Sequence, residues 1–193
     1  MTSIMGSAKL EFEKLTKGFM SFDVKPAPVD NNSCIPQGTA LYDTIAGNSV
    51  SFEVTTYDRY QNLFYEDAAI ESYVKHVQSK KIVPAHIVGN GQGAYGASYT
   101  LTLSGDWTLF LNIEGKPMMG SPFSMTVIPA NVFASNCVAK GEGLSTCTAG
   151  ELAMFDVTTF DAFGNRKTNG GSKVIGIIKG PGEGTCIVRD KAN

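Results

Sequence analysis

The stretch that decides the fold is S-V-S-F-E-V-T-T-Y at Ser49–Tyr57, where Phe and Val fall two positions apart with acids or threonines between them. Apolar side chains at every second position are the pattern of a β-strand that buries one face. A second stretch, L-A-M-F-D-V-T-T-F at Leu152–Phe160, has the same pattern 103 positions later. The two stretches therefore predict equivalent strands in two copies of one unit.

The duplication extends well beyond these two strands. When residues 26–62 are aligned without a gap on residues 129–165, 14 of the 37 positions are identical, whereas chance would give roughly two. A chain made of tandem copies is more often a rod or an adhesion array than an enzyme. The identical positions include Pro26/Pro129, Cys34/Cys137, Gly38/Gly141, Asp58/Asp161 and Asn62/Asn165.

Alternation of apolar and polar residues recurs at Tyr99–Leu103, Trp107–Ile113 and Phe123–Ile128. Turn residues separate these runs about every 8–12 positions, which predicts an all-β fold. The stretch Glu66–Gln78 has helical spacing, but we interpret it as strand plus loop because it aligns with the β-branched Ser172–Ile178 of the second copy. One period of about 100 residues is the size of a single immunoglobulin-like sandwich.

The charge pattern excludes two classes of partner. The net charge is −2 with both signs interspersed, so we expect neither nucleic acid nor a membrane surface as a partner. The N-terminus lacks the apolar core of a signal peptide, and no run of about 18 apolar residues could span a bilayer. These features favour a cytoplasmic protein.

The four cysteines allow two interpretations. Cys34, Cys137, Cys147 and Cys186 could all be reduced, partly buried thiols, or Cys137 and Cys147 could be bridged in an oxidising compartment. No C-x-x-C spacing supports zinc.

The sequence shows no arrangement of residues that would support catalysis. There is no Ser-His-Asp ordering, phosphate loop or carboxylate pair of useful spacing, so we expect neither an enzyme nor a cofactor. His76 and His86 are predicted to be solvated or edge histidines, and Asp58 and Asp161 are predicted to cap turns.

Several linked motifs identify a family. The motifs of the first copy are Gly93-Ala94-Tyr95, Tyr99, Gly105-Asp106-Trp107 and Gly120-Ser121-Pro122-Phe123, and those of the second copy include Ala149-Gly150-Glu151 and Asp161–Asn165. Over about residues 33–190 their spacing resembles the filamin-type immunoglobulin-like repeat. Trp107 in place of the usual tyrosine, Gln61 in place of a glycine, and Asp67-Ala68 in place of paired glycines indicate a divergent member.

We expect most of these motif residues to be architectural. The aromatic residues should fill the core between two sheets, and a Gly-Asn pair after a strand allows positive φ in a tight connection. The structural motif residues are Tyr95, Tyr99, Gly105, Trp107, Ser121, Pro122, Phe123, Asp161, Gly164 and Asn165.

The phase of the repeat predicts three parts, which together are a fragment of a longer array. Residues 1–28 are expected to be the last two strands of a preceding repeat, at Lys9–Phe12 and Phe19–Val24. Residues 29–129 are expected to form one complete seven-stranded sandwich, and residues 130–193 the first four strands of a following repeat.

The resemblance implies a non-catalytic scaffold or spacer rod of the cytoskeleton. Such a rod separates an actin-binding end from a self-association end, so actin would be contacted only through regions outside this chain. The resemblance also places partner peptides beside the third strand, where they add by backbone hydrogen bonding. In the second copy this strand is predicted at Ser172–Ile178, next to Thr185–Val188, and the candidate contacts are Val174, Ile175, Ile177 and Ile178.

Only one alternating set of these residues can line the groove, because successive side chains of a strand face opposite sides.

Two other functions stay open. The cysteines and the divergence favour an extracellular adhesion array of the gamete-surface type. The third possibility is an accessory sandwich module attached to an enzyme or a ubiquitin-ligase-type protein.

Overall fold

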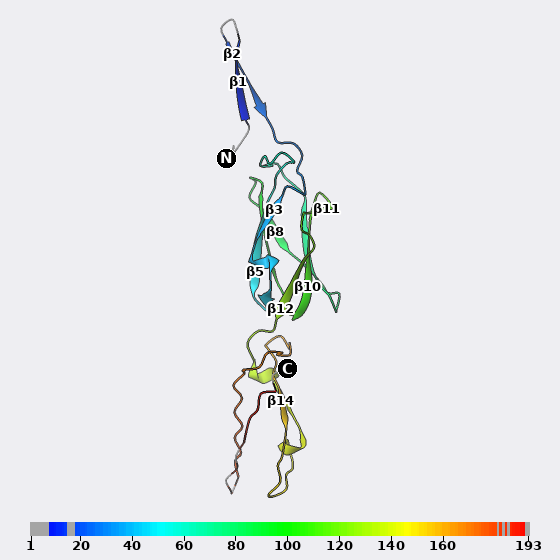
Figure 1. Cartoon of the computed structure of the whole chain (residues 1–193), viewed down its shortest axis with the longest axis vertical. Helices are drawn as coiled ribbons and strands as arrows, with labels where there is room; N and C mark the ends of the chain where they lie inside the picture. The colour runs from blue at the N-terminus through cyan, green and yellow to red at the C-terminus, as the bar shows by residue number, and fades with distance from the viewer. Residues whose placement is uncertain (1–7, 15–17, 181, 183, 185, 192–193) are drawn as a thin grey trace. The chain divides into compact units, whose positions relative to one another are not determined.

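The computed structural model of the chain describes residues 8–14, 18–180, 182, 184 and 186–191. Within that part the chain forms β-strands and three short 3-10 segments, without an α-helix. The fold is therefore all-β, as the alternating pattern predicts (Figure 1). The chain divides into two compact units, and the second contains Ile128–Asn193 with the short pieces Ile45–Gly47 and Thr102–Ser104.

The first unit is a sandwich of two antiparallel sheets (Figure 1). One sheet has four strands in the order β3-β5-β9-β8. The other has the order β4-β12-β10-β6-β7, and β11 pairs with β10. The bounds are β3 (Ile35–Gly38), β4 (Thr44–Ile45), β5 (Ser49–Thr55), β6 (Ile70–His76), β7 (Ile82–Pro84), β8 (His86–Gly89), β9 (Ala94–Thr100), β10 (Gly105–Ile113), β11 (Lys116–Pro117) and β12 (Phe123–Ile128).

The core lies between the two sheets and is built by the predicted alternation. Phe52 and Val54 of β5 are 3% and 1% exposed, and Trp107 of β10 is 1% exposed. The stretch Glu66–Gln78 contains the strand β6, as interpreted from its place in the repeat. The sheets hold ten strands instead of seven, because β4, β7 and β11 add pairs of two or three residues at their margins.

Before the sandwich, β1 (Ala8–Lys14) and β2 (Gly18–Val24) form an antiparallel hairpin, with Ala8 opposite Val24. Both predicted strands of this segment, Lys9–Phe12 and Phe19–Val24, lie within it. The segment η1 (Thr39–Leu41) follows β3 directly.

The second unit repeats only part of this architecture among its described residues. It contains β13 (Val138–Lys140) paired with β14 (Asp156–Thr158), together with η2 (Ala134–Asn136) and η3 (Glu142–Leu144). The predicted strand Leu152–Phe160 is thus shortened to three residues. Phe155 and Val157 are each 38% exposed, because within the described part of this unit no second sheet covers their face.

The prediction of a strand at Ser172–Ile178 is wrong. The structure assigns no strand to these residues, because among the described residues they form no hydrogen-bonded ladder with a neighbour. The segment still runs beside its predicted neighbour, of which Thr185 lies outside the described residues: a Cβ on Gly176 would overlap Cys186 Sγ, and one on Gly184 would lie 3.1 Å from Ile178.

Candidate functional site

The predicted partner-binding residues show an alternation in exposure. Ile175 and Ile177 are 68% and 75% exposed, whereas Val174 is half-buried. Ile178 departs from the alternation and is also exposed. The structure thus separates a solvent-facing pair, Ile175 and Ile177, from the inward-facing Val174.

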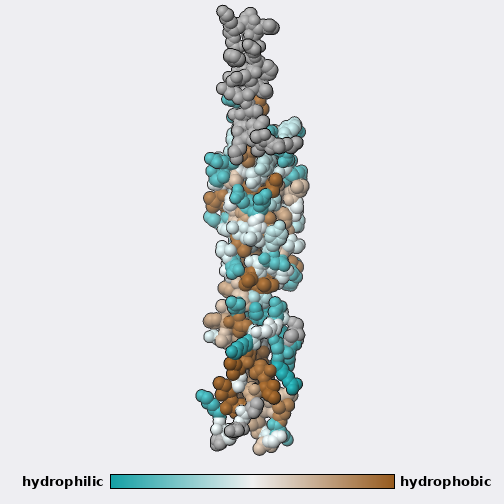
Figure 2. All heavy atoms as spheres, turned by 60° about the vertical axis from the view of Figure 1, so that its left-hand side comes forward, coloured by the Kyte–Doolittle hydropathy of each residue, from teal (hydrophilic) through white to brown (hydrophobic). Residues whose placement is uncertain are grey.

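The neighbouring segment, residues 186–188, adds an apolar residue that the sequence did not single out. Ile187 is 75% exposed, and it directly follows Cys186, whose sulfur stands over Gly176. Exposed apolar side chains therefore occur both on residues 172–178 and on residues 186–188. Figure 2 shows such side chains gathered on the second unit, and they also include Leu152 and Met154.

The equivalent edge in the first unit is already occupied. There β7 pairs with β6, placing Pro84 opposite Tyr73 and Ile82 opposite Lys75. A partner strand could add at this position only by displacing β7, because the backbone groups of β6 on that side already form hydrogen bonds with β7. The second unit has no such covering strand among its described residues.

The turn after β5 contains a buried carboxylate with a full set of donors. Asp58 is 0% exposed and accepts hydrogen bonds from Ala27 N (2.9 Å), Tyr60 N (2.8 Å), Asn62 N (2.9 Å) and Asn62 Nδ2 (2.9 Å). Burial by itself would raise the pKa of Asp58, but these donors outweigh it and lower the pKa below the ordinary value.

The second unit repeats this turn bond for bond. Asp161 is 0% exposed and accepts from Ala130 N, Phe163 N, Asn165 N and Asn165 Nδ2 at 2.7–2.9 Å. Burial again would raise the pKa of Asp161, but the hydrogen bonds outweigh it, so that the pKa is again below the ordinary value. Both carboxylates cap turns, as predicted, and they also hold the segment that leads into each unit. With their oxygens engaged, they act as structural clamps.

The other motif residues contact the core or its margins. Tyr99 donates its hydroxyl to Ala40 O and, at 3.2 Å, to Met125 Sδ, and burial raises the pKa of Tyr99. The Tyr95 hydroxyl accepts from Ala68 N at 2.7 Å. At the other margin, Ser121 Oγ accepts from Leu111 N at 3.0 Å, Pro122 follows a cis bond, and half-buried Phe123 begins β12.

One histidine prediction is wrong. His76 is buried, 5% exposed, and its ring lies 4.9 Å from the Trp107 ring. Its Nδ1 accepts from Ser79 N at 3.0 Å, and a Cβ on Gly105 would lie 2.9 Å from its Nε2. The strand β6 directs even-numbered side chains inward, so the register of the strand buries this ring. His86, by contrast, is exposed on the edge strand β8.

Neither a metal centre nor a disulfide is formed by the part of the chain that the structure describes. No group of three His, Cys, Asp or Glu side chains there could hold a metal ion. All four cysteines are free thiols. Cys34 is buried and donates to Asp30 O at 3.2 Å, and burial raises the pKa of its thiol. The described residues contain no helix suited to crossing a bilayer.

Comparisons with known proteins extend these observations. The chain is 30% identical over 94 residues to tripartite motif-containing protein 2 of Homo sapiens and of Bos taurus. The match covers 49% of this chain and only 13% of those proteins. These relatives are thus much longer than the matched repeat.

Solved structures share the fold at low sequence identity. FdeC, an Escherichia coli adhesin, superimposes with a TM-score of 0.59 at 18% identity, covering 82% of this chain and 52% of that chain. Invasin, a bacterial integrin-binding protein, gives a TM-score of 0.53 at 13% identity, covering 87% and 37%. The Lin-41 filamin domain is also similar, with a TM-score of 0.46 at 18% identity, covering 54% and 97%. The fold is an immunoglobulin-like β-sandwich.

The family model of the Filamin/ABP280 repeat matches residues 28–124. This range contains both sheets of the first unit up to the start of β12. It also contains the aromatic and glycine motifs of the first copy, which are part of the evidence for the sequence resemblance. The chain belongs to the Filamin/ABP280 repeat family.

Proposed function

We propose that this chain is a segment of a scaffold or spacer array of filamin-type repeats. Residues 1–28 close a preceding repeat, residues 29–129 form a complete one, and residues 130–193 begin the next. The duplication at 103 positions and the family match over residues 28–124 support this division. The module is non-catalytic, and its work is to space other domains and to bind protein partners.

In this proposal the array is cytoplasmic and belongs to the cytoskeleton. Actin is reached only through regions outside this chain. Partner peptides pair by backbone hydrogen bonding with the Ser172–Ile178 segment, whose backbone forms no ladder among the described residues, and they place apolar side chains against it. The observation that carries this proposal is the exposed apolar pair Ile175 and Ile177, which has no covering strand among the described residues.

The experiment compares a longer natural chain, carrying the whole second repeat, with its Ile175→Asp/Ile177→Asp variant. Because a charge disfavours an apolar pocket, the variant should lose the partners that the parent chain captures from lysate. Ile82→Asp is the matched control, since Ile82 is an exposed isoleucine (56%) on β7 of the first unit. If the double variant keeps the circular dichroism spectrum of the parent chain and still captures the same partners, the segment does not bind them and serves only as a spacer between domains.

The extracellular adhesion array is the second candidate. The structural likeness to FdeC and invasin, which covers more than four fifths of this chain, favours it. A count of free thiols distinguishes the two compartments, if the protein is purified from its natural source without reductant and then denatured for the titration. Four reactive thiols per chain support the cytoplasmic scaffold, whereas two support a surface array with Cys137 and Cys147 bridged.

The accessory module of a larger multidomain protein is the third candidate. It is favoured by the match to tripartite motif-containing protein 2, of which the matched segment makes up only 13%. The complete open reading frame tests it directly. Further tandem copies of the 103-residue unit support the array, and a different domain beside a single pair of copies supports the module.

A further inference from the structure

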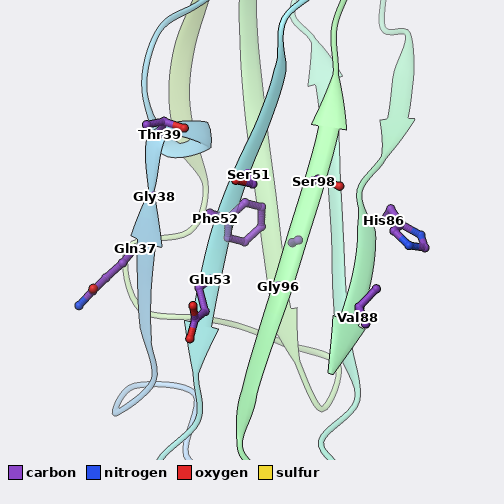
Figure 3. Close-up of a pocket in the computed structure, with 11 residues that line it drawn as sticks. Gln37, Gly38, Thr39, Ser51, Phe52, Glu53, His86, Val88, Gly96 and Ser98 are labelled. Carbon is purple, nitrogen blue, oxygen red and sulfur yellow. The ribbon is translucent and has the colours of Figure 1, made fainter. Parts of the chain in front are cut away.

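The outer face of the four-stranded sheet is hollowed. A depression of about 610 Å³ lies over β3, β5, β9 and β8. Figure 3 shows its residues as two rows that cross the strands. The strand register places Gln37, Glu53, Gly96 and Val88 in one row, and it places Ser51, Ser98 and His86 in the other.

The depression exists because its floor is made of very small residues. Ser51, Gly96 and Ser98 occupy the two middle strands, β5 and β9. Larger side chains border these small ones, with Gln37 on β3, Glu53 on β5 and Val88 on β8. A flat sheet face thereby becomes a shallow trough.

The glycine in the floor has no structural reason to be glycine. Gly96 does not adopt positive φ, and a Cβ built on it would meet no atom nearer than 3.9 Å, Val88 O. By contrast, Gly38 has a φ of 146°, and a Cβ there would lie 2.5 Å from Phe52 Cα. Glycine inside a strand weakens the strand and often marks a place where a ligand or another backbone approaches closely.

The lining includes several polar side chains and carries one formal charge, that of Glu53. Glu53 and His86 are exposed, and within the described residues neither side chain forms a hydrogen bond or an ion pair with the protein. No lysine or arginine lines the depression. The Glu53 carboxylate can therefore accept hydrogen bonds from a guanidinium or ammonium group, which would be charge-assisted. The hydroxyls of Ser51 and Ser98 can pair with backbone groups of a ligand.

The dimensions suit a short extended segment. Four strands spaced by about 4.8 Å make this sheet face about 14 Å wide, which four residues of extended chain cross at about 3.3 Å each. We propose that this trough binds an extended segment of a partner protein, with its backbone packed on Gly96 and a basic side chain paired with Glu53. This site is a sheet face, separate from the strand-addition segment at Ser172–Ile178.

The test uses the full chain and a display library of random 12-residue peptides. Selected peptides should carry Arg or Lys, and their amide shift changes should map to Ser51, Glu53, Gly96 and Ser98. Gly96→Val fills the trough without strained backbone, so affinity should fall at least tenfold while the thermal midpoint is not lowered. Glu53→Lys should reduce affinity by a similar factor for the basic peptides.

Two controls match these variants in chemistry. Thr108→Leu adds bulk to the outer face of the opposite sheet, and Glu71→Lys reverses an exposed carboxylate on β6. Both should bind the selected peptides like the parent chain. Peptides that bind through the second unit would instead lose affinity in Ile175→Asp/Ile177→Asp, so failure here is distinct from failure of the strand-addition proposal.

Each contrary result overturns the proposal. One is a library that yields no peptide sensitive to Gly96→Val, and another is binding that survives both variants. Neutral glycans on an array that bind the parent chain but not Gly96→Val would assign the trough to a sugar. Self-association of the parent chain that Gly96→Val abolishes would assign it to a second copy.

Discussion

The two copies of the unit allow a comparison of single residues in equivalent surroundings. Asp58 and Asp161 have the same four donors in the same order, so the turn does not depend on the rest of either unit. Gln61 and Gly164 are also equivalent, with φ of 67° and 82°. The backbone conformation of the turn is thus kept although the side chain differs.

The buried carboxylate predicts a dependence of stability on pH. The folded pKa of Asp58 is lowered, whereas an unfolded Asp has a pKa of about 3.9. The stabilisation is therefore complete above about pH 5 and is lost as the pH falls below about 4. In the Asp58→Asn variant, the urea midpoint should fall less between pH 6 and pH 3 than it does in the parent chain. The variant Asp67→Asn, which changes an exposed carboxylate, should show the same pH dependence of the midpoint as the parent. Equal slopes in all three chains would rule out this role.

The turn also offers a stabilising substitution. A non-glycine residue at positive φ costs about 1–2 kcal/mol, and glycine removes this strain at some entropic cost. Gln61→Gly should therefore raise the free energy of unfolding by about 0.5–1 kcal/mol. Gln92→Gly, in an exposed loop without positive φ, is the control and should destabilise slightly. A lowered urea midpoint for Gln61→Gly would refute the strain.

At the scale of single elements, β10 contributes more buried apolar side chains to the core than any other strand of the sandwich. Trp107, Leu109, Leu111 and Ile113 are each at most 1% exposed, and they alternate with half-buried residues. The strand pairs with β12 on one side and with β6 on the other. A change at its inward positions therefore affects both neighbours.

Trp107 is the most informative of these positions because it is the single tryptophan of the chain. Trp107→Ala should reduce the free energy of unfolding by about 3–5 kcal/mol, through lost burial and the cavity left behind. Trp107→Phe should cost less, because it keeps an aromatic ring beside His76. Chemical denaturation measures both values, and native emission like that of free indole in water would contradict the burial.

At the scale of the whole molecule, the two units differ in how fully they cover their apolar side chains. The first unit buries them between two sheets. In the second, Leu152, Met154 and Ile177 are 85%, 71% and 75% exposed. Exposed apolar surface of this kind is an aggregation hazard.

The difference predicts how separated units will behave. The fragment 29–129 should fold alone and bind little anilinonaphthalene sulfonate, whereas the fragment 130–193 should bind the dye and aggregate. A natural extension of about 40 residues, enough for three further strands, should remove dye binding and raise the thermal midpoint. Equal dye binding by the short and extended fragments would show that the proposed phase of the repeat is wrong.

The sequence by itself determined the fold class, the duplication and the strands β5, β10 and β12, whereas the predicted run Tyr99–Leu103 overlaps β9 only at Tyr99 and Thr100. Alternation with period two specifies which face of β5, β10 and β12 is buried, and this is a local property of each stretch. The aligned Asp and Asn positions likewise predicted two capped turns, because the capping donors lie mostly within four residues of the carboxylate.

Only the tertiary structure decided what depends on contacts between distant segments. The burial of His76 follows from its packing on Trp107, 31 positions away. Ser172–Ile178 has strand-like composition, yet it forms no strand, because a strand is defined by a hydrogen-bonded neighbour and not by its own residues. The trough over Gly96 needs four strands side by side, since no single strand reveals that its small residues adjoin those of the next.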